Sequence, residues 1–173
     1  MIVEPLTPVD AALPGPLLTE LAALYASNRE FQQLSGDFPD PDDIRPEQVA
    51  ASLADEFADP GARALLARSA GRLVAVAVTI DAHPDPDDPD PWIGLLMVHA
   101  REHRSGYGRQ LAEVIEDRFR TDGRTGLRLA ALANNPRALA FWTALGYTEI
   151  DRRRDRERGR PCLVLRKDLT AAG

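Results

Sequence analysis

Apolar residues run almost without interruption in one stretch of this chain and then recur at helical spacing. Residues 92–98 (WIGLLMV) are apolar apart from Gly94, and a run of this length is typical of a strand buried on both faces. Residues 107–121 follow with an amphipathic helical pattern. Its apolar face carries Leu111, Val114, Ile115 and Phe119, and its charged face carries Arg109, Glu113, Glu116, Asp117 and Arg118. The pattern predicts a central strand followed by a helix.

The beginning of the chain predicts a strand and then a helix. Residues 1–6 are expected to form a short strand that Pro5 and Pro8 end. Leucines at helical spacing after Pro16 predict an amphipathic helix that runs to about Asn28 or a little beyond.

A loop, a second helix and a hairpin are predicted next. Residues 35–46 (SGDFPDPDDIRP) contain turn-forming residues and no periodic apolar pattern, so they are expected to form a loop. The helix over 46–57 begins at a proline, which suits the first turn of a helix. Two apolar stretches, 62–69 and 72–82, are separated by Ala70-Gly71 and predict a hairpin of antiparallel strands.

Alternating prolines and aspartates fill residues 83–91 (HPDPDDPDP). This composition forbids regular structure and favours an extended, solvated loop. The segment is either a polar connection between strands or an acidic lip beside a functional site, and the first reading is favoured.

The C-terminal part predicts a parallel strand, a helix and a final hairpin. A strand over 126–132 is expected to lie parallel to the strand over 92–98, in a right-handed βαβ unit. A helix begins after Asn135-Pro136 and runs to about Leu145, and strands over 147–154 and 161–168 surround the turn RERG.

Length and composition restrict the class of protein. The 173 residues fit one domain, residues 1–173, and the formal net charge of −6 argues against a nucleic-acid or anionic-membrane surface. The only cysteine, Cys162, lies in an apolar run, and the three histidines show no spacing of metal ligands. The sequence shows neither a signal-peptide pattern nor a run approaching ~20 apolar residues. We expect a cytoplasmic protein without a metal, and a homodimer is left open.

The turn between the central strand and its helix has the composition of an anion site. Gly106 and Gly108 flank Tyr107 at the helix start, where backbone N–H groups are unpaired and carry partial positive charge. Arg104 and Arg109 bracket the glycines and could neutralise a diphosphate. A glycine pair alone would more often be an ordinary strand–helix turn, whose glycines only satisfy the backbone geometry.

Two stretches together resemble a known family. Val98 to Leu111 resembles motif A of the GNAT superfamily of N-acyltransferases, and Asn135 to Tyr147, with N-x-x-A and Gly-Tyr, resembles motif B. The resemblance implies an α/β fold, the GNAT fold. Its mixed, mostly antiparallel central sheet has a parallel βαβ unit at its centre and is flanked by helices.

The resemblance also implies that acetyl-CoA is the co-substrate. In this family the strand before the glycine turn splays from its parallel neighbour, and the pantetheine arm pairs with main-chain groups, here those of Met97 and Val98. The diphosphate would lie on amides from Arg104 to Arg109, and His103 stands where the family has Arg or Gln. The implied cofactor-binding residues are Met97, Val98, His103, Arg104, Gly106, Tyr107, Gly108, Arg109 and Asn135. Asn135 could bind the cofactor or cap its helix.

Catalytic residues are harder to identify. Removal of a proton from the acceptor amine calls for a carboxylate or a histidine. The candidates are His99 and Glu30, followed by Asp37 and His83, and each is more often a structural residue than a base. Family members often protonate the leaving thiolate with a tyrosine, whose position here holds Trp142. Tyr147 is interpreted as a core residue.

Two main hypotheses for the function remain. The first is an acyl-CoA-dependent N-acetyltransferase that acts on a small amine, with residues 17–57 shaping the acceptor side. The second is a non-catalytic acyl-CoA-binding or regulatory module, suggested by Trp142 and by the lack of an obvious base. Acetylation of a protein or of aminoacyl-tRNA is a weaker third, because an RNA partner requires a basic face.

Overall fold

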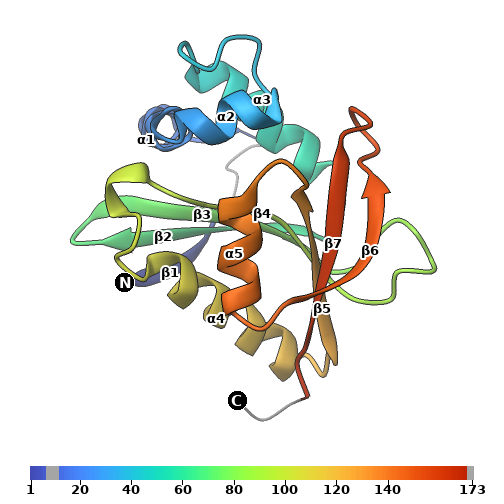
Figure 1. Cartoon of the computed structure of the whole chain (residues 1–173). Helices are drawn as coiled ribbons and strands as arrows, with labels where there is room; N and C mark the ends of the chain where they lie inside the picture. The colour runs from blue at the N-terminus through green and yellow to red at the C-terminus, as the bar shows by residue number, and fades with distance from the viewer. Residues whose placement is uncertain (7–11, 171–173) are drawn as a thin grey trace. The chain divides into compact units, whose positions relative to one another are not determined.

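The structure is a computed structural model that describes residues 1–6 and 12–170 (Figure 1). These residues group into two compact units. The first unit contains Met1–Thr79 and Leu95–Ala112, and the second contains Ile80–Gly94 and Glu113–Gly173. The boundary falls within one strand and one helix, which therefore contribute residues to both units.

The elements follow the order expected from the sequence, with one additional α-helix and a short 3-10 turn. In chain order they are β1 (Ile2–Leu6), α1 (Gly15–Ser27), α2 (Arg29–Ser35), α3 (Pro46–Phe57), β2 (Ala62–Ser69), β3 (Arg72–Ile80), β4 (Trp92–Val98), η1 (Ala100–Glu102), α4 (Tyr107–Thr121), β5 (Gly126–Leu132), α5 (Pro136–Ala144), β6 (Thr148–Arg154) and β7 (Pro161–Asp168). The predicted bounds of α3, β4, α4 and β5 are confirmed.

The strands form one mixed sheet in the order β1-β2-β3-β4-β5-β7-β6. β4 and β5 are parallel and pair at Trp92 with Arg128 and at Ile93 with Leu129. β7 is antiparallel to both β5 and β6. The predicted sheet, with a parallel βαβ unit at its centre, is confirmed.

Three predicted boundaries were wrong. Pro5 does not end β1 but pairs with Leu65 inside it. An edge strand tolerates proline because one side of its backbone needs no partner. The chain after Asn28 starts a new helix, α2, where the sequence suggested only a small extension of α1. β3 ends at Ile80 and not at residue 82. Pro8 lies outside the described residues.

In the first unit, helices pack on strands through a continuous apolar core. α1 contributes Leu21 and Leu24, and α3 contributes Val49 and Leu53, all at most 1% exposed. These side chains belong to the same buried cluster as residues of β2, β3 and the end of β4. The hairpin of β2 and β3 turns at Ala70 and Gly71, with φ of 49° and 78°. Positive φ at both positions is what a two-residue hairpin turn of type I′ requires.

The two faces of α4 differ from the prediction at two positions. Val114, assigned to the apolar face, is 40% exposed, whereas Glu116, assigned to the charged face, is 2% exposed. The buried stripe consists of Leu111, Ala112, Ile115, Glu116 and Phe119. These positions recur at helical spacing, so the stripe is rotated slightly from the one that the apolar residues alone indicated.

Glu116 can be buried because three side chains of the second unit donate hydrogen bonds to it. Lys167 Nζ lies 2.7 Å from Oε2, the Tyr147 hydroxyl lies 3.1 Å from Oε1, and Arg120 Nη2 lies 3.3 Å from Oε2. A buried carboxylate is tolerated when it is paired in this way. Burial, followed by the nearby carboxylate, raises the pKa of Tyr147 above its ordinary value.

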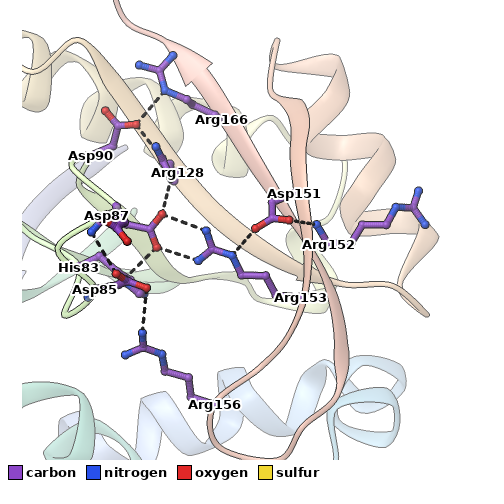
Figure 2. A network of polar contacts seen from close by, with 11 residues as sticks. His83, Asp85, Asp87, Asp90, Arg128, Asp151, Arg152, Arg153, Arg156 and Arg166 are labelled. Carbon is purple, nitrogen blue, oxygen red and sulfur yellow. Dashed lines mark hydrogen bonds and ion pairs between the residues drawn. The ribbon is translucent and has the colours of Figure 1, made fainter.

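The acidic segment 83–91 makes hydrogen bonds and ion pairs with arginines of the second unit (Figure 2). Asp88 is 4% exposed and receives two hydrogen bonds from Arg153, of 2.8 and 3.0 Å, and one from Arg128. Asp90 is 6% exposed and accepts from Arg128 and Arg166, both at 2.8 Å. The expectation of a solvated loop was therefore wrong for these two aspartates, and the segment acts as a strand connection.

These arginines also lower the pKa values of the two aspartates. For Asp88 the largest contribution is the hydrogen bond from Arg153. For Asp90, desolvation alone would raise the pKa, but the hydrogen bonds and charges of Arg166 and Arg128 outweigh it. Both carboxylates are thus ionised at neutral pH, and their stabilisation depends on that charge.

Replacement of Asp88 by asparagine is expected to destabilise the protein by about 3 kcal/mol at pH 7, because it removes the negative partner of two guanidinium groups. The stabilisation by a carboxylate of lowered pKa is present above the unfolded pKa of about 3.9 and is lost as pH falls through the folded value. The difference from wild type should therefore shrink below about pH 4.

Urea denaturation at pH 7 and pH 3 measures this effect. Asp87→Asn is the matched control, since Asp87 is exposed, and it should change stability by no more than about 0.5 kcal/mol. A loss for Asp88→Asn that is equally large at both pH values would contradict the assignment.

Candidate functional site

The turn between β4 and α4 has a tightly folded main chain. After η1, the Ser105 N–H donates to the Glu102 carbonyl at 3.2 Å, and Gln110 N–H donates to the Gly106 carbonyl at 3.0 Å, which starts α4. Arg104 and Gly106 have φ of 67° and 83°. Glycine adopts this conformation without steric cost, whereas arginine does so at the expense of some strain. Such strain is often found at binding sites.

The first N–H groups of α4 have no acceptor in the described part of the chain. A helix leaves its first N–H groups without intrahelical partners, and within residues 1–6 and 12–170 no other group accepts from those of Tyr107, Gly108 and Arg109. Gly106 is exposed, and a Cβ built on it would have only Gln110 Nε2 nearby, at 3.7 Å. The amides therefore form a surface where an anion can approach the backbone.

Two positive side chains flank these amides. Arg104 and Arg109 are both exposed, and among the described residues neither makes a hydrogen bond or an ion pair. This differs from the arginines of the second unit, such as Arg128 and Arg153, which are held by aspartates. Unpaired guanidinium groups beside unpaired amides are a combination suited to a phosphate group.

Tyr107 fixes the start of α4 to the end of β2. Its hydroxyl donates to Ser69 Oγ at 2.9 Å, and its ring is half-buried. Tyr107 would then contribute to cofactor binding through its main chain. Gly108 is buried, unlike Gly106.

The end of β4 is bound by side chains and not only by strands. The Val98 carbonyl accepts a hydrogen bond of 3.0 Å from Asn28 Nδ2, and His103 Nε2 lies 3.1 Å from the same oxygen. His103 Nε2 also lies 3.1 Å from Asn28 Oδ1. The structure thus brings together Val98 and His103, which the sequence singled out, and adds Asn28, which it did not.

Met97, unlike Val98, contributes its side chain to the apolar core. Its side chain is 6% exposed and belongs to the apolar core of the first unit. The pairing of pantetheine with main-chain groups of Met97 and Val98 stays a prediction.

Asn135, in the second unit, caps a helix. Its Oδ1 accepts from the Ala138 N–H at 3.1 Å at the start of α5. This is the geometry of an N-cap, and it supports one of the two roles that the sequence left open. A contact between Asn135 and a cofactor stays a prediction.

The aromatic residues of motif B form a packed cluster. Trp142 is 7% exposed and packs edge-on against Phe141 and Tyr147, with ring centroids 4.9 and 5.0 Å away. Tyr147 is 1% exposed, and its hydroxyl proton is engaged by Glu116. The interpretation of Tyr147 as a core residue is confirmed by its burial.

The first catalytic candidate, His99, has one ring nitrogen engaged in a hydrogen bond. His99 Nδ1 accepts from the Arg101 N–H at 3.3 Å and caps η1. Burial, then the charge of Arg101, lowers the pKa of His99, so the neutral ring carries its proton on Nε2. In this state His99 has no vacant basic nitrogen and would act as a base only after releasing Arg101.

The other candidates belong to other elements of the chain. Glu30 and Asp37 are exposed, at the start of α2 and just after its end. His83 belongs to the acidic segment of the second unit, where its Nδ1 accepts from the Asp85 N–H at 3.1 Å and its ring stacks on Trp92. Burial lowers the pKa of His83, which favours the neutral ring. A general base is not identified.

Two general properties complete the description. None of the helices in the described part of the chain has the length and apolar character needed to cross a membrane. Among the same residues, no group of three or more His, Cys, Asp and Glu side chains is arranged to hold a metal ion.

Comparison with known proteins identifies the family. A scan against protein-family models matches residues 23–147, more than half of the chain, to the acetyltransferase (GNAT) family. The chain belongs to the GNAT family. No curated protein sequence gives a match.

Solved structures with the same fold include several acetyltransferases. An acetyltransferase from Thermus thermophilus has a TM-score of 0.71 at 21% identity, with 97% of each chain covered. The ribosomal-protein-S18-alanine N-acetyltransferase from Escherichia coli has a TM-score of 0.61 at 18% identity, covering 99% of this chain and 97% of that one. An aminoglycoside 6'-N-acetyltransferase complexed with coenzyme A has a TM-score of 0.63 at 15% identity, covering 100% and 99%. At these identities the likeness shows the fold alone.

Asn28 and Ser69 are the contacts that sequence reasoning missed in this GNAT chain. Asn28 ends a predicted helix, where asparagine is common, and Ser69 ends a predicted strand. Their partners lie 70 and 38 residues away in the sequence, for Val98 and Tyr107 respectively. No local pattern carries that information.

The N-cap role of Asn135 makes a stability prediction. Asn135→Ala should lower the free energy of unfolding by about 1 kcal/mol, whereas Asn135→Asp should be nearly neutral, because aspartate is an equally good N-cap. Urea denaturation measures both. If the two variants were equally destabilised, the amide nitrogen and not Oδ1 would be the important atom, and the capping role would be rejected.

Proposed function

We propose that this GNAT chain, residues 1–173 acting as one domain, is an acyl-CoA-dependent N-acetyltransferase. It would transfer the acetyl group of acetyl-CoA directly to an amine of a small acceptor. The observation that supports this most is the turn at the start of α4, where the first amides of the helix and the guanidinium groups of Arg104 and Arg109 have no partner among the described residues.

A diphosphate suits this turn for electrostatic reasons. The helix N-terminus provides several N–H donors and a partial positive charge, and two arginines add two full charges. Charge-assisted hydrogen bonds of this kind are roughly twice as strong as neutral ones. The turn directly follows β4, whose main chain would pair with the pantetheine arm, so both parts of acetyl-CoA would be bound by consecutive segments.

The transfer itself requires little from the protein beyond positioning. The neutral amine attacks the thioester carbonyl, a C–N bond forms as the C–S bond breaks, and the thiolate leaves. The nitrogen releases its surplus proton to solvent, and the thiolate takes up a proton to give the free thiol. An amine with a pKa near about 10.4 is mostly protonated at pH 7, so its proton must first be removed. A thiol of pKa about 8.5 is an acceptable leaving group without an acid.

A small acceptor is proposed on grounds of charge and topology. The formal net charge of −6 favours an amine over a nucleic acid. Residues 17–57 carry no phosphate-binding pattern, and in the first unit they form the helices α1 to α3, which we expect to shape the acceptor side.

A non-catalytic acyl-CoA-binding module is the alternative, and one observation favours it. Trp142 stands at the position of the family's tyrosine and is packed between two rings, while the hydroxyl of Tyr147 is buried against Glu116. The indole of Trp142 has no proton to give at useful pH, and the hydroxyl proton of Tyr147 is already engaged by Glu116. Thiol release from acetyl-CoA in the presence of an amine panel distinguishes the two, because the module would bind but not turn over.

Gly108→Glu tests the cofactor site. A carboxylate among the first amides of α4 would repel the diphosphate, so affinity for acetyl-CoA should fall about tenfold or more. Isothermal calorimetry on the folded variant measures this. Gly15→Glu is a control, since a Cβ there has nothing within 4 Å and the same charge is added outside the turn.

Because Gly108 is buried, a second variant protects the test against misfolding. Arg109→Glu changes an exposed side chain in the first turn of α4 and should also weaken binding about tenfold or more. Arg152→Glu, on exposed β6, changes the net charge equally and should leave affinity unchanged. Unaltered affinity in Arg109→Glu would reject the site.

The roles of Trp142 and Tyr147 predict the pH profile of turnover. Turnover should rise with pH as the amine loses its proton and should show no fall assignable to a phenol near about pH 10. Trp142→Phe should keep most activity and lose stability through its smaller volume. Tyr147→Phe should keep the profile and lose about 1 kcal/mol, because Glu116 loses a donor.

A stopped assay from about pH 6 to about pH 10.5, a range that spans the phenol pKa, with urea denaturation of each variant, checks these expectations. A fall at high pH that persists in Trp142→Phe and disappears in Tyr147→Phe would show that Tyr147 is the acid.

A further inference from the structure

The carbonyl oxygen of Val98, the last residue of β4, is held by two side chains from distant parts of the sequence. Asn28 Nδ2 donates to it at 3.0 Å from the end of α1, and His103 Nε2 approaches it to 3.1 Å from just after η1. The two side chains also contact each other, with 3.1 Å between Asn28 Oδ1 and His103 Nε2. Asn28, His103 and the Val98 carbonyl are called the Val98 clamp below.

The hydrogen atoms of the Val98 clamp follow from its partners. Asn28 Nδ2 faces the carbonyls of Leu24 and Val98, both at 3.0 Å, so the opposite amide orientation would place oxygen against oxygen. His103 Nε2 faces two oxygen acceptors and must therefore carry a proton. Nε2 is thus engaged by the clamp and is not available to a phosphate.

A second contact between the same segments strengthens the clamp. Ser27 Oγ accepts from the Ala100 N–H at 3.0 Å and donates to the Leu24 carbonyl at 2.7 Å. The last turn of α1 thus binds both the end of β4 and the beginning of η1. His103, five residues after Val98, closes this turn on itself.

Strand geometry explains why the Val98 carbonyl matters. The His99 N–H donates to the Val74 carbonyl of β3 at 2.8 Å. Main-chain groups alternate between the two edges of a strand, so those of Val98 point away from β3 and those of Met97 point toward it. Val98 is therefore the residue whose N–H remains for a strand-like ligand while its carbonyl is already engaged.

We propose that the Val98 clamp positions the turn from Val98 to Gly106 for acetyl-CoA, and that His103 is a positioning residue and not a phosphate ligand. This rests on the proposed function. The clamp fixes the end of β4, from which the main chain passes through η1 to the amides of α4. With the turn held in place before binding, the ligand does not have to order it, and affinity increases accordingly.

Two substitutions of His103 separate the position of its N–H donor from the presence of an aromatic ring. The amide nitrogen of glutamine can reach the place of Nε2, whereas that of asparagine is too short to do so. His103→Gln should thus keep the donor to the Val98 carbonyl, and His103→Asn should lose it. Both are neutral, so they differ mainly in reach.

Amide hydrogen exchange of the protein without ligand is the first measurement, because it does not depend on the proposed function. His103→Asn should raise the exchange rates of amides within residues 99–106 about tenfold or more, and His103→Gln should restore them to near the wild-type rates. Arg109→Ala, which removes a proposed phosphate contact, should leave them unchanged.

Calorimetry with acetyl-CoA is the second measurement. His103→Asn should weaken binding about tenfold, and His103→Gln should bind within a factor of about three of wild type. Asn28→Ala should act on the same clamp, so the double variant with His103→Asn should lose little more affinity than the weaker-binding of the two single variants.

The outcomes separate the alternatives. Weaker binding with unchanged exchange would make His103 a phosphate ligand and overturn the proposal. Faster exchange with unchanged affinity, failure of glutamine to restore either property, or full additivity with Asn28→Ala would also overturn it. A wild-type protein that does not bind acetyl-CoA would overturn the proposed function, whereas the exchange experiment would still decide whether the clamp orders the turn.

Discussion

The candidate site depends on how the main chain leaves β4. The strand ends at Val98. Within a few residues the main chain must change from strand to helix hydrogen bonding, and the first N–H groups of α4 are left without acceptors among the described residues. Ser27, the last residue of α1, and Asn28, its C-cap, make hydrogen bonds here that a neighbouring strand would otherwise provide. Left-handed conformations at Arg104 and Gly106 complete the change of direction. The strain at Arg104 is tolerated because the surrounding bonds determine the path of the chain.

Charge is distributed unevenly in a way that favours one anion site. The protein carries a formal net charge of −6, yet the turn before α4 is locally positive. In the second unit, aspartates and arginines neutralise one another, as Asp88 and Asp90 do with Arg128. Positive charge that is not neutralised internally attracts a ligand more strongly, particularly at low ionic strength. The negative remainder of the surface disfavours extended polyanions.

The sequence was sufficient where local pattern and tertiary environment agree. The bounds of β4, α4 and β5 followed from apolar runs, helical spacing and glycines, and the motif around Gly106 and Gly108 indicated the family. It was insufficient where a polar residue is buried by distant partners. Glu116 looks like a surface residue of α4, because its donor Lys167 lies 51 residues later. Asn28 looks like a helix end, because its strand partner lies 70 residues away.

The two compact units divide the chain in an unusual manner, because the dividing points lie inside β4 and inside α4. Neither unit is a continuous length of polypeptide. A fragment that ends at Thr79 would lack residues 95–112 and with them the whole turn between β4 and α4. A fragment that begins at Ile80 would keep the turn but lose Asn28, Ser27 and the hairpin residue that receives Tyr107. Neither fragment, whether made by proteolysis or by gene truncation, should therefore fold on its own. Split-protein complementation would have to supply both fragments together.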